Sequence, residues 1–265
     1  MTHSLLTDRR LRPAAAAAAL SALLCAGAVL APGSADAAVM QHRSTAFSGT
    51  SRVGALFSTS HGRLASHFCT ASVVDSRSRD LLVTAAHCVV APGSGRATNG
   101  LVFIPGYHAG QEPYGRWAVR KAIVDYRWSA HGDPDHDVAF LTTAPVGRGG
   151  RVQDAVGAEA IAFNRAVRDR AVAIGYPVGS GRPVRCGSRL RRFTGSQVEF
   201  DCRGLPGGTS GGPLLTGAGP TGAGRGTVVG VIGGYQSGGA TADVSYSSYF
   251  GRDIAAVYRT ALGQG

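Results

Sequence analysis

The chain has 265 residues, of which 44% are hydrophobic and 16% are charged. This length is enough for one domain with a sizeable core, or for two small barrels that share an interface. The net charge of +11 favours contact with anionic surfaces, but the sequence has no nucleic-acid-binding motif and no aromatic platform for stacking bases. We therefore expect no nucleic-acid partner.

The first 37 residues have the pattern of an export signal. Three arginines within residues 9–12 precede an apolar, alanine-rich run over residues 14–30, and residues 35–37 read Ala-Asp-Ala, a cleavage site. The run is close to the shortest length for a membrane span, but a Pro-Gly pair ends it just before that site. We predict a signal peptide over residues 1–37, a secreted extracellular product and no stable membrane span after its removal. Residues 38–51 are either a short propeptide or a disordered start.

Short apolar and β-branched runs alternate with clusters of Gly, Pro, Asp and Ser along the rest of the chain. This spacing is typical of an all-β barrel or sandwich. The strands that we expect from these runs cover residues 52–57, 81–84, 101–104, 171–174, 197–200 and 227–232.

Three motifs carry residue types suited to nucleophilic catalysis. His87 lies in Thr84-Ala85-Ala86-His87-Cys88, Asp137 opens Asp137-Val138-Ala139-Phe140-Leu141, and Ser210 lies in Gly207-Gly208-Thr209-Ser210-Gly211-Gly212-Pro213. A serine hydroxyl needs an imidazole to take its proton and an acid to fix the tautomer of that imidazole. The serine motif also satisfies G-x-S-x-G, but that α/β-hydrolase motif needs a later histidine, and none follows His136.

The boundary between two halves of the protein is expected in the Pro/Gly/Arg-rich stretch 145–151. It gives an N-terminal barrel over residues 38–147 and a C-terminal barrel over residues 148–265. A triad assembled between two barrels requires such a partition. Ile254, Val257, Tyr258 and Leu262 stand at helical offsets near the C-terminus and predict a helix packed against the second barrel.

The His, Asp, Ser order of the motifs resembles the trypsin/chymotrypsin-like serine peptidase family, and Gly207-Gly208-Thr209-Ser210 resembles its bacterial secreted branch, similar to the glutamyl endopeptidases. The resemblance runs from about Gly49 to the C-terminus. It implies an all-β fold of two six-stranded antiparallel β-barrels with a C-terminal helix. It also implies hydrolysis of peptide bonds in a protein or peptide substrate through an acyl-enzyme intermediate. No metal or organic cofactor is needed, and we expect a monomer.

The resemblance assigns roles to individual residues. Ser210 is the expected nucleophile, His87 the base and then the acid, and the amides of Gly208 and Ser210 the expected oxyanion hole. Asp137 is the expected acid among Asp133, Asp135 and Asp137, because the family places an apolar strand directly after its acid. An EF-hand calcium loop is excluded, since Val138 stands where that loop needs Gly and no Glu stands at its twelfth position.

Four cysteines remain after the signal peptide, and an even number in an exported chain indicates disulfides. Four cysteines allow three pairings. We select Cys69 with Cys88, which matches the family bridge beside the catalytic histidine, and Cys186 with Cys202. A metal site is not expected, because the chain has no Cys-x-x-Cys spacing.

The chain departs from the family at three positions. Thr209 replaces the aspartate that pairs with the new N-terminus in digestive members, so we do not expect that activation switch. Gly204 stands where trypsin-like members have an acid, and Ile232 stands where glutamyl-specific members have a histidine. We expect a small or apolar pocket near Gly204, Ile232 and Gly233. The segment of Gly233, Gly234 and Tyr235 would pair with the substrate backbone.

Two other functions fit the same motifs. A catalytically weak or inactive homologue would act as a binding protein, and replacement of Ser210 by alanine would then leave its binding function unchanged. An exported esterase on the same fold would prefer ester over peptide substrates.

Overall fold

The computed structural model describes residues 42–147 and 149–264. The predicted signal peptide and its cleavage site lie outside these ranges. Within them, no helix is long and apolar enough to cross a membrane.

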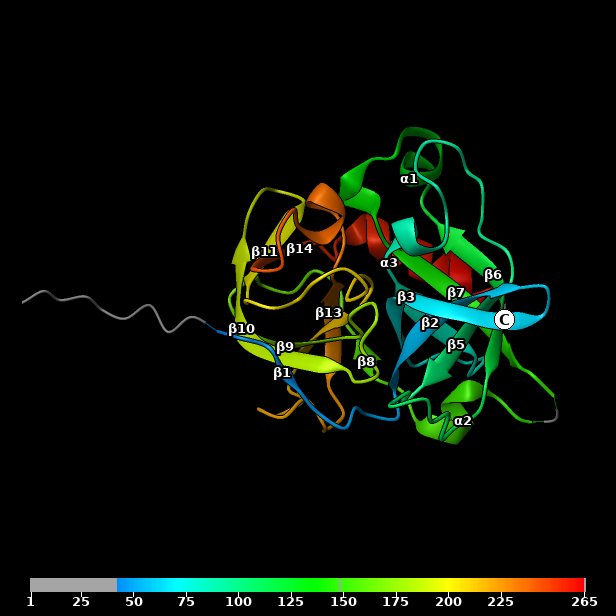
Figure 1. The fold of residues 1–265 in the computed structure, drawn as a ribbon. Coiled ribbons are helices and arrows are strands. Elements are labelled where there is room, and N and C mark those ends of the chain that lie inside the picture. The colour runs from blue at the N-terminus through cyan, green and yellow to red at the C-terminus, as the bar shows by residue number, and fades with distance from the viewer. Residues whose placement is uncertain (1–41, 148, 265) are drawn as a thin grey trace, which may run out of the picture. The chain divides into compact units, whose positions relative to one another are not determined.

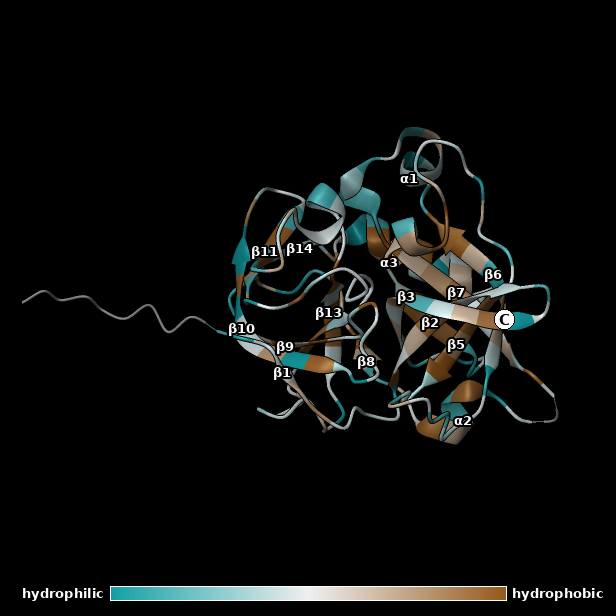
Figure 2. Cartoon of the chain, in the orientation of Figure 1, coloured by the Kyte–Doolittle hydropathy of each residue, from teal (hydrophilic) through white to brown (hydrophobic). Residues whose placement is uncertain are grey.

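The first half of the described chain forms a closed antiparallel barrel (Figure 1). Its strands follow the order β2-β3-β4-β7-β6-β5. Buried Leu56, Leu82, Phe103 and Leu141 fill one hydrophobic cluster of this barrel, and Figure 2 shows hydrophobic residues along strands such as β5. The strands are β2 (Val53–Ser60), β3 (Arg63–Val73), β4 (Leu81–Thr84), β5 (Leu101–Pro105), β6 (Trp117–Val124) and β7 (Ala139–Pro145).

The second half supplies seven strands of an eight-stranded sheet, in the order β14-β11-β10-β9-β12-β13-β8, and β1 from the N-terminal segment is the eighth, paired to β10. All pairings are antiparallel except that of β8 with β13, which is parallel. The predicted all-β double-barrel fold is confirmed, although β1 and β8 add to the six strands expected for this half. The strands are β1 (Thr45–Ala46), β8 (Ala160–Ile161), β9 (Arg170–Gly175), β10 (Val184–Arg192), β11 (Gln197–Asp201), β12 (Pro213–Thr216), β13 (Thr227–Val231) and β14 (Val244–Ser248).

The chain just after the predicted signal peptide is part of this sheet. Thr45 and Ala46 pair with Arg185 and Val184 of β10. Ser44 also donates its amide to the carbonyl of Arg203 at 2.8 Å. Of the two alternatives for residues 38–51, a disordered start therefore does not describe residues 44–46.

Helices are few and short. They are α1 (Tyr126–His131), α2 (Val152–Val156) and α3 (Arg252–Leu262), with 3₁₀ turns η1 (Ala86–Cys88), η2 (Pro134–His136) and η3 (Tyr235–Gly238). Two of these turns, η1 and η2, carry or adjoin predicted catalytic residues.

The C-terminal helix forms as predicted, but its packing partner is different. Helix α3 packs on β6 and β7 of the first barrel. The ring of Tyr258 lies 5.3 Å from that of Phe140, centroid to centroid, and the Tyr258 hydroxyl donates to the carbonyl of Asp75. The prediction of packing on the second barrel was wrong, because helical periodicity defines an apolar face but not the surface that covers it.

Candidate active site

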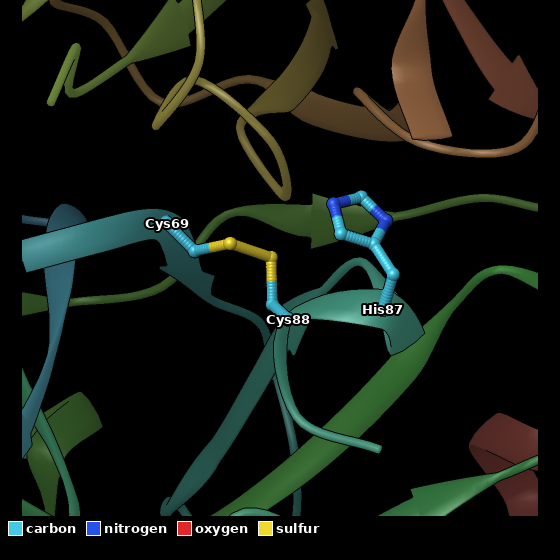
Figure 3. Close-up of side chains that lie close together, drawn as sticks. All are labelled: Cys69, His87 and Cys88. Atoms are coloured by element: carbon cyan, nitrogen blue, oxygen red, sulfur yellow. A yellow bond between two sulfur atoms is a disulfide. The ribbon is translucent and has the colours of Figure 1, made fainter. Parts of the chain in front are cut away.

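His87 is held at the end of a buried strand. All four residues of β4 are buried, and the turn η1 that carries His87 follows one residue later. Thr84 donates its hydroxyl to the carbonyl of Thr70 on β3 at 2.7 Å. A disulfide from Cys69 on β3 to Cys88 ties the turn from the other side (Figure 3). These links fix the backbone of His87 while its side chain remains 17% exposed.

The carboxylate of Asp137 is fully buried and contacts His87 twice. Nδ1 of His87 lies 2.7 Å from Oδ2 of Asp137, and the His87 amide donates to Oδ1 at 2.8 Å. The amide of Gly234 donates to Oδ2, also at 2.8 Å. Because a carboxylate only accepts hydrogen bonds, Nδ1 of the neutral ring carries the proton and Nε2 is left as an acceptor. This is the tautomer that a general base requires.

The two neighbouring acids have other partners. Asp133 caps η2, accepting the amide of Asp135 at 3.0 Å, and its other oxygen lies 3.1 Å from Nδ1 of His136. Asp135 accepts hydrogen bonds from Ser196 and Gln197 of the second sheet. Within the described residues, Asp137 is thus the only one of the three acids that contacts His87.

The serine motif forms the turn that enters β12, and it lies against β3. The carbonyl of Ser210 accepts the amide of Thr70 at 2.8 Å. A Cβ on Gly211 would overlap the hydroxyl of Thr84 and the carbonyl of Thr70, so only glycine fits there. Ser210 is therefore anchored to Thr70, the residue next to Cys69, near the turn of His87. Its Oγ makes no hydrogen bond with any described residue.

Gly208 and Ser210 present free amides. Neither N–H donates to another residue within the described chain. The carbonyl of Gly207 accepts from Val178 at 2.9 Å, and that of Gly208 accepts from Thr70 Oγ1 at 2.9 Å, so both carbonyls are engaged elsewhere. Two unpaired donors in one turn can bind a developing oxyanion.

The buried hydroxyl of Thr209 has a hydrogen-bond partner, and the residue takes part in no ion pair among the described residues. It is 1% exposed, and its hydroxyl donates to the carbonyl of Pro206 at 2.7 Å. The Cβ that a side chain would add at Gly175 would lie 2.6 Å from the Thr209 Cβ, so the two positions are closely packed. Thr209 thus packs as a neutral residue between the serine turn and β9.

The five predicted pocket residues do not all lie at an open surface. Gly204 has φ +88°, and its carbonyl accepts from the hydroxyl of Ser44, which occupies the space where a side chain would project. Ile232 is 3% exposed, in the core of the second sheet. Its backbone pairs with Gly211 and Gly212, so it supports the serine turn.

The segment of Gly233, Gly234 and Tyr235 uses all its amides within the protein. They donate to the carbonyl of Tyr246, the carboxylate of Asp137 and Oε1 of Gln197, respectively. The carbonyl of Gly233 accepts no hydrogen bond from a described residue. Of the predicted substrate-pairing groups, this carbonyl is therefore the one that is available in this structure.

Three residues near this segment were missed from the sequence. Gln197 contacts the backbone of the segment, and Tyr246 and Phe193 form an aromatic cluster with Tyr235, with ring centroids 4.8–5.3 Å apart. Phe193 and Tyr235 are exposed. No motif marks these residues, because the segments that carry them meet only in the folded protein.

Both cysteine pairs agree with the expected pairing: Cys69 with Cys88, and Cys186 with Cys202. Sγ of Cys69 and Cys88 and a ring nitrogen of His87 lie within 4.8 Å of one another (Figure 3). The two sulfurs are bonded to each other, so they do not offer the thiolates that a metal ion would need.

Comparison with known proteins identifies the family. The model of the trypsin-like peptidase domain matches residues 69–231. The chain belongs to the trypsin-like peptidase family. The match begins at Cys69 and includes all three candidate catalytic residues.

Solved structures of proteases have the same fold. Protease Anisep from Arthrobacter nicotinovorans is 24% identical, with a TM-score of 0.72 over 83% of this chain and 99% of that chain. The thermostable serine protease AL20 from an extremophilic microorganism is 30% identical, with a TM-score of 0.70 over 82% of this chain and 99% of that one. A Glu endopeptidase is 16% identical, with a TM-score of 0.65 over 85% and 99%. No curated protein matches the sequence.

Proposed function

We propose that the protein is a secreted serine endopeptidase that uses Ser210, His87 and Asp137. The observation that carries the proposal is the buried Asp137 carboxylate 2.7 Å from Nδ1 of His87, beside a serine turn with two free amides. Family membership and the 30% identity to a serine protease support the same function.

The proposed reaction begins when Nε2 of His87 takes the hydroxyl proton of Ser210. Oγ then forms a bond to the carbonyl carbon of the substrate, and the oxyanion lies between the amides of Gly208 and Ser210. As the C–N bond breaks, the imidazolium of His87 gives its proton to the leaving amine. Water, deprotonated by the same ring, then releases the acid and regenerates Ser210.

Asp137 orients the ring and stabilises its charged form throughout. Its two oxygens are held by three N–H groups, from His87 and Gly234. No metal or organic cofactor takes part in the proposed chemistry.

The proposed substrate is a protein or peptide, with a small or apolar residue before the cleaved bond. Gly204 supports this, because it offers no charge to an Arg or Lys side chain and the hydroxyl of Ser44 fills the adjacent space. The carbonyl of Gly233 is the proposed acceptor for a substrate amide. A peptide library cleaved chiefly after Glu or Arg would contradict this specificity.

Secretion is proposed from the N-terminal signal pattern, and the two disulfides support it, because such bonds persist in oxidising compartments.

Fluorophosphonate labelling of the processed protein tests the activity. A covalent label in the wild type that is absent from Ser210→Ala would establish an activated serine. A folded protein that takes no label would contradict the proposal and favour a binding role.

A further inference from the structure

Gln197 connects the two barrels beside the candidate site. It opens β11 of the second sheet, and it is 3% exposed. Its Nε2 donates to the carbonyl of Pro134 at 2.9 Å and to Oδ1 of Asp135 at 2.7 Å. Its Oε1 accepts the amide of Tyr235 at 3.1 Å. One buried side chain thus binds both the loop before Asp137 and the segment after Gly233.

A second link joins the same two segments. The amide of Gly234, next to Tyr235, donates to Oδ2 of Asp137, two residues after Asp135. The links through Gln197 and through Gly234 therefore run side by side between the first barrel and the second. If the link through Gln197 is lost, the Gly234 bond is left as the direct link from this segment to the Asp137 carboxylate.

Further contacts hold the loop side of this arrangement. The hydroxyl of Ser248 donates to the carbonyl of Pro134 at 3.0 Å, and the hydroxyl of Ser196 donates to Asp135 at 2.5 Å. The NH₂ group of the Gln197 side chain donates both of its hydrogen bonds to this loop, and the side-chain oxygen accepts from the amide of Tyr235. A carboxylate cannot donate and a thioether makes only weak hydrogen bonds, so no other side chain of this size provides all three contacts.

We infer that Gln197 is a positioning residue, which sets both the triad acid Asp137 and the substrate-binding segment of Gly233, Gly234 and Tyr235. It makes no hydrogen bond with His87 or Ser210 in the described residues, so it acts through the groups that it holds. The inference rests on the proposed peptidase function.

Gln197→Met keeps the volume of the side chain and removes its strong hydrogen bonds. Misplacement of catalytic groups by about 1 Å can cost on the order of 10²-fold in rate, so kcat/KM should fall by roughly this factor.

Two further variants separate the two halves of the link. Gln197→Glu keeps an acceptor for Tyr235 but loses both donors to the loop, so it should lower kcat more than it raises KM. Tyr235→Pro removes the N–H that Gln197 accepts, at a side chain that is 40% exposed, and should mainly raise KM. Tyr235→Pro also tests the inference if Gln197→Met does not fold.

Gln153→Met is the matched control. Gln153 on α2 also bridges two groups through its amide, accepting from the amide of Ser76 and donating to Asp75, both at 3.1 Å. It has no contact with the candidate site, so its loss should lower stability alone.

Steady-state kinetics, with kcat and KM determined separately, and melting temperatures of the four variants test the inference. The inference is overturned if Gln197→Met has the same kcat and KM as Gln153→Met. If Gln197→Met does not fold, unchanged kcat and KM of Tyr235→Pro overturn it instead. A wild-type protein that fluorophosphonate fails to label would instead refute the peptidase function itself, so the two failures are distinguishable.

Discussion

Replacing Gly208 with alanine should damage catalysis far more than substrate binding. The residue has φ +95°, where a non-glycine residue costs roughly 1–2 kcal/mol. A Cβ there would also lie 2.5 Å from both the carbonyl oxygen of Tyr176 and the amide nitrogen of Val178. Both are backbone atoms, so the turn of Gly208 must move, and its amide moves with it.

Loss of one oxyanion donor costs about 10²–10³-fold in kcat. KM should change little, because the donor acts mainly on charge that develops in the transition state. The assay is steady-state hydrolysis of a peptide substrate, with the melting temperature measured in parallel.

Gly179→Ala separates backbone strain from displacement of the amide. Gly179 has φ +74°, but a Cβ there meets no atom within 4 Å. Its alanine variant should lose about 1–2 kcal/mol, or roughly 2–8 °C in Tm for a domain of this size, and should retain kcat. If Gly208→Ala has the same kcat as Gly179→Ala, the amide of Gly208 does not stabilise the transition state.

Three further predictions concern the triad, the disulfide and a buried histidine. Asp137→Asn should reduce kcat by about 10⁴-fold, because an amide NH₂ facing Nδ1 of His87 favours the wrong tautomer; steady-state kinetics would refute this if kcat fell less than tenfold. Replacing both Cys69 and Cys88 by alanine removes a bridge with a sequence separation of 19 and should cost about 3 kcal/mol in urea unfolding; an unchanged midpoint would contradict it. Burial lowers the pKa of His67 below 6.5, so its native state binds a proton less readily than the unfolded chain, and stability should fall as the pH drops below 6.5. His67→Phe should flatten that dependence in melting curves between pH 7 and pH 5, and equal slopes for both proteins would refute it.

The sequence predicted those parts of the site whose chemistry lies in contiguous motifs. His87, Asp137 and Ser210 each stand in a short segment with a recognisable flank, and the structure brings His87 and Asp137 into contact. Gln197 has no such flank. Its partners are Asp135, 62 residues earlier, and Tyr235, 38 residues later, so only the folded chain reveals its contacts.

The fold was predictable to a similar extent. The six apolar runs singled out from the sequence all fall on strands, with only Arg52 and Ile232 just outside them, since short β-branched segments between turn residues have few other stable arrangements. Strand β3 was not among these runs, because its sequence, RLASHFCTASV, combines polar and small residues and has no continuous apolar stretch. The partner of α3 was also hidden, because Phe140 and Asp75 are distant from it in sequence.

The pairing of β1 with β10 has a consequence for the solubility of the protein. Residues 184 and 185 of β10 pair with β9 on one side and with β1 on the other, whereas β11 covers only residues 190–192. Trimming the N-terminus beyond Ala46 would leave unpaired backbone at the start of β10, and exposed strand edges promote association between chains. The short strand β1 therefore shields a sheet edge from neighbouring molecules.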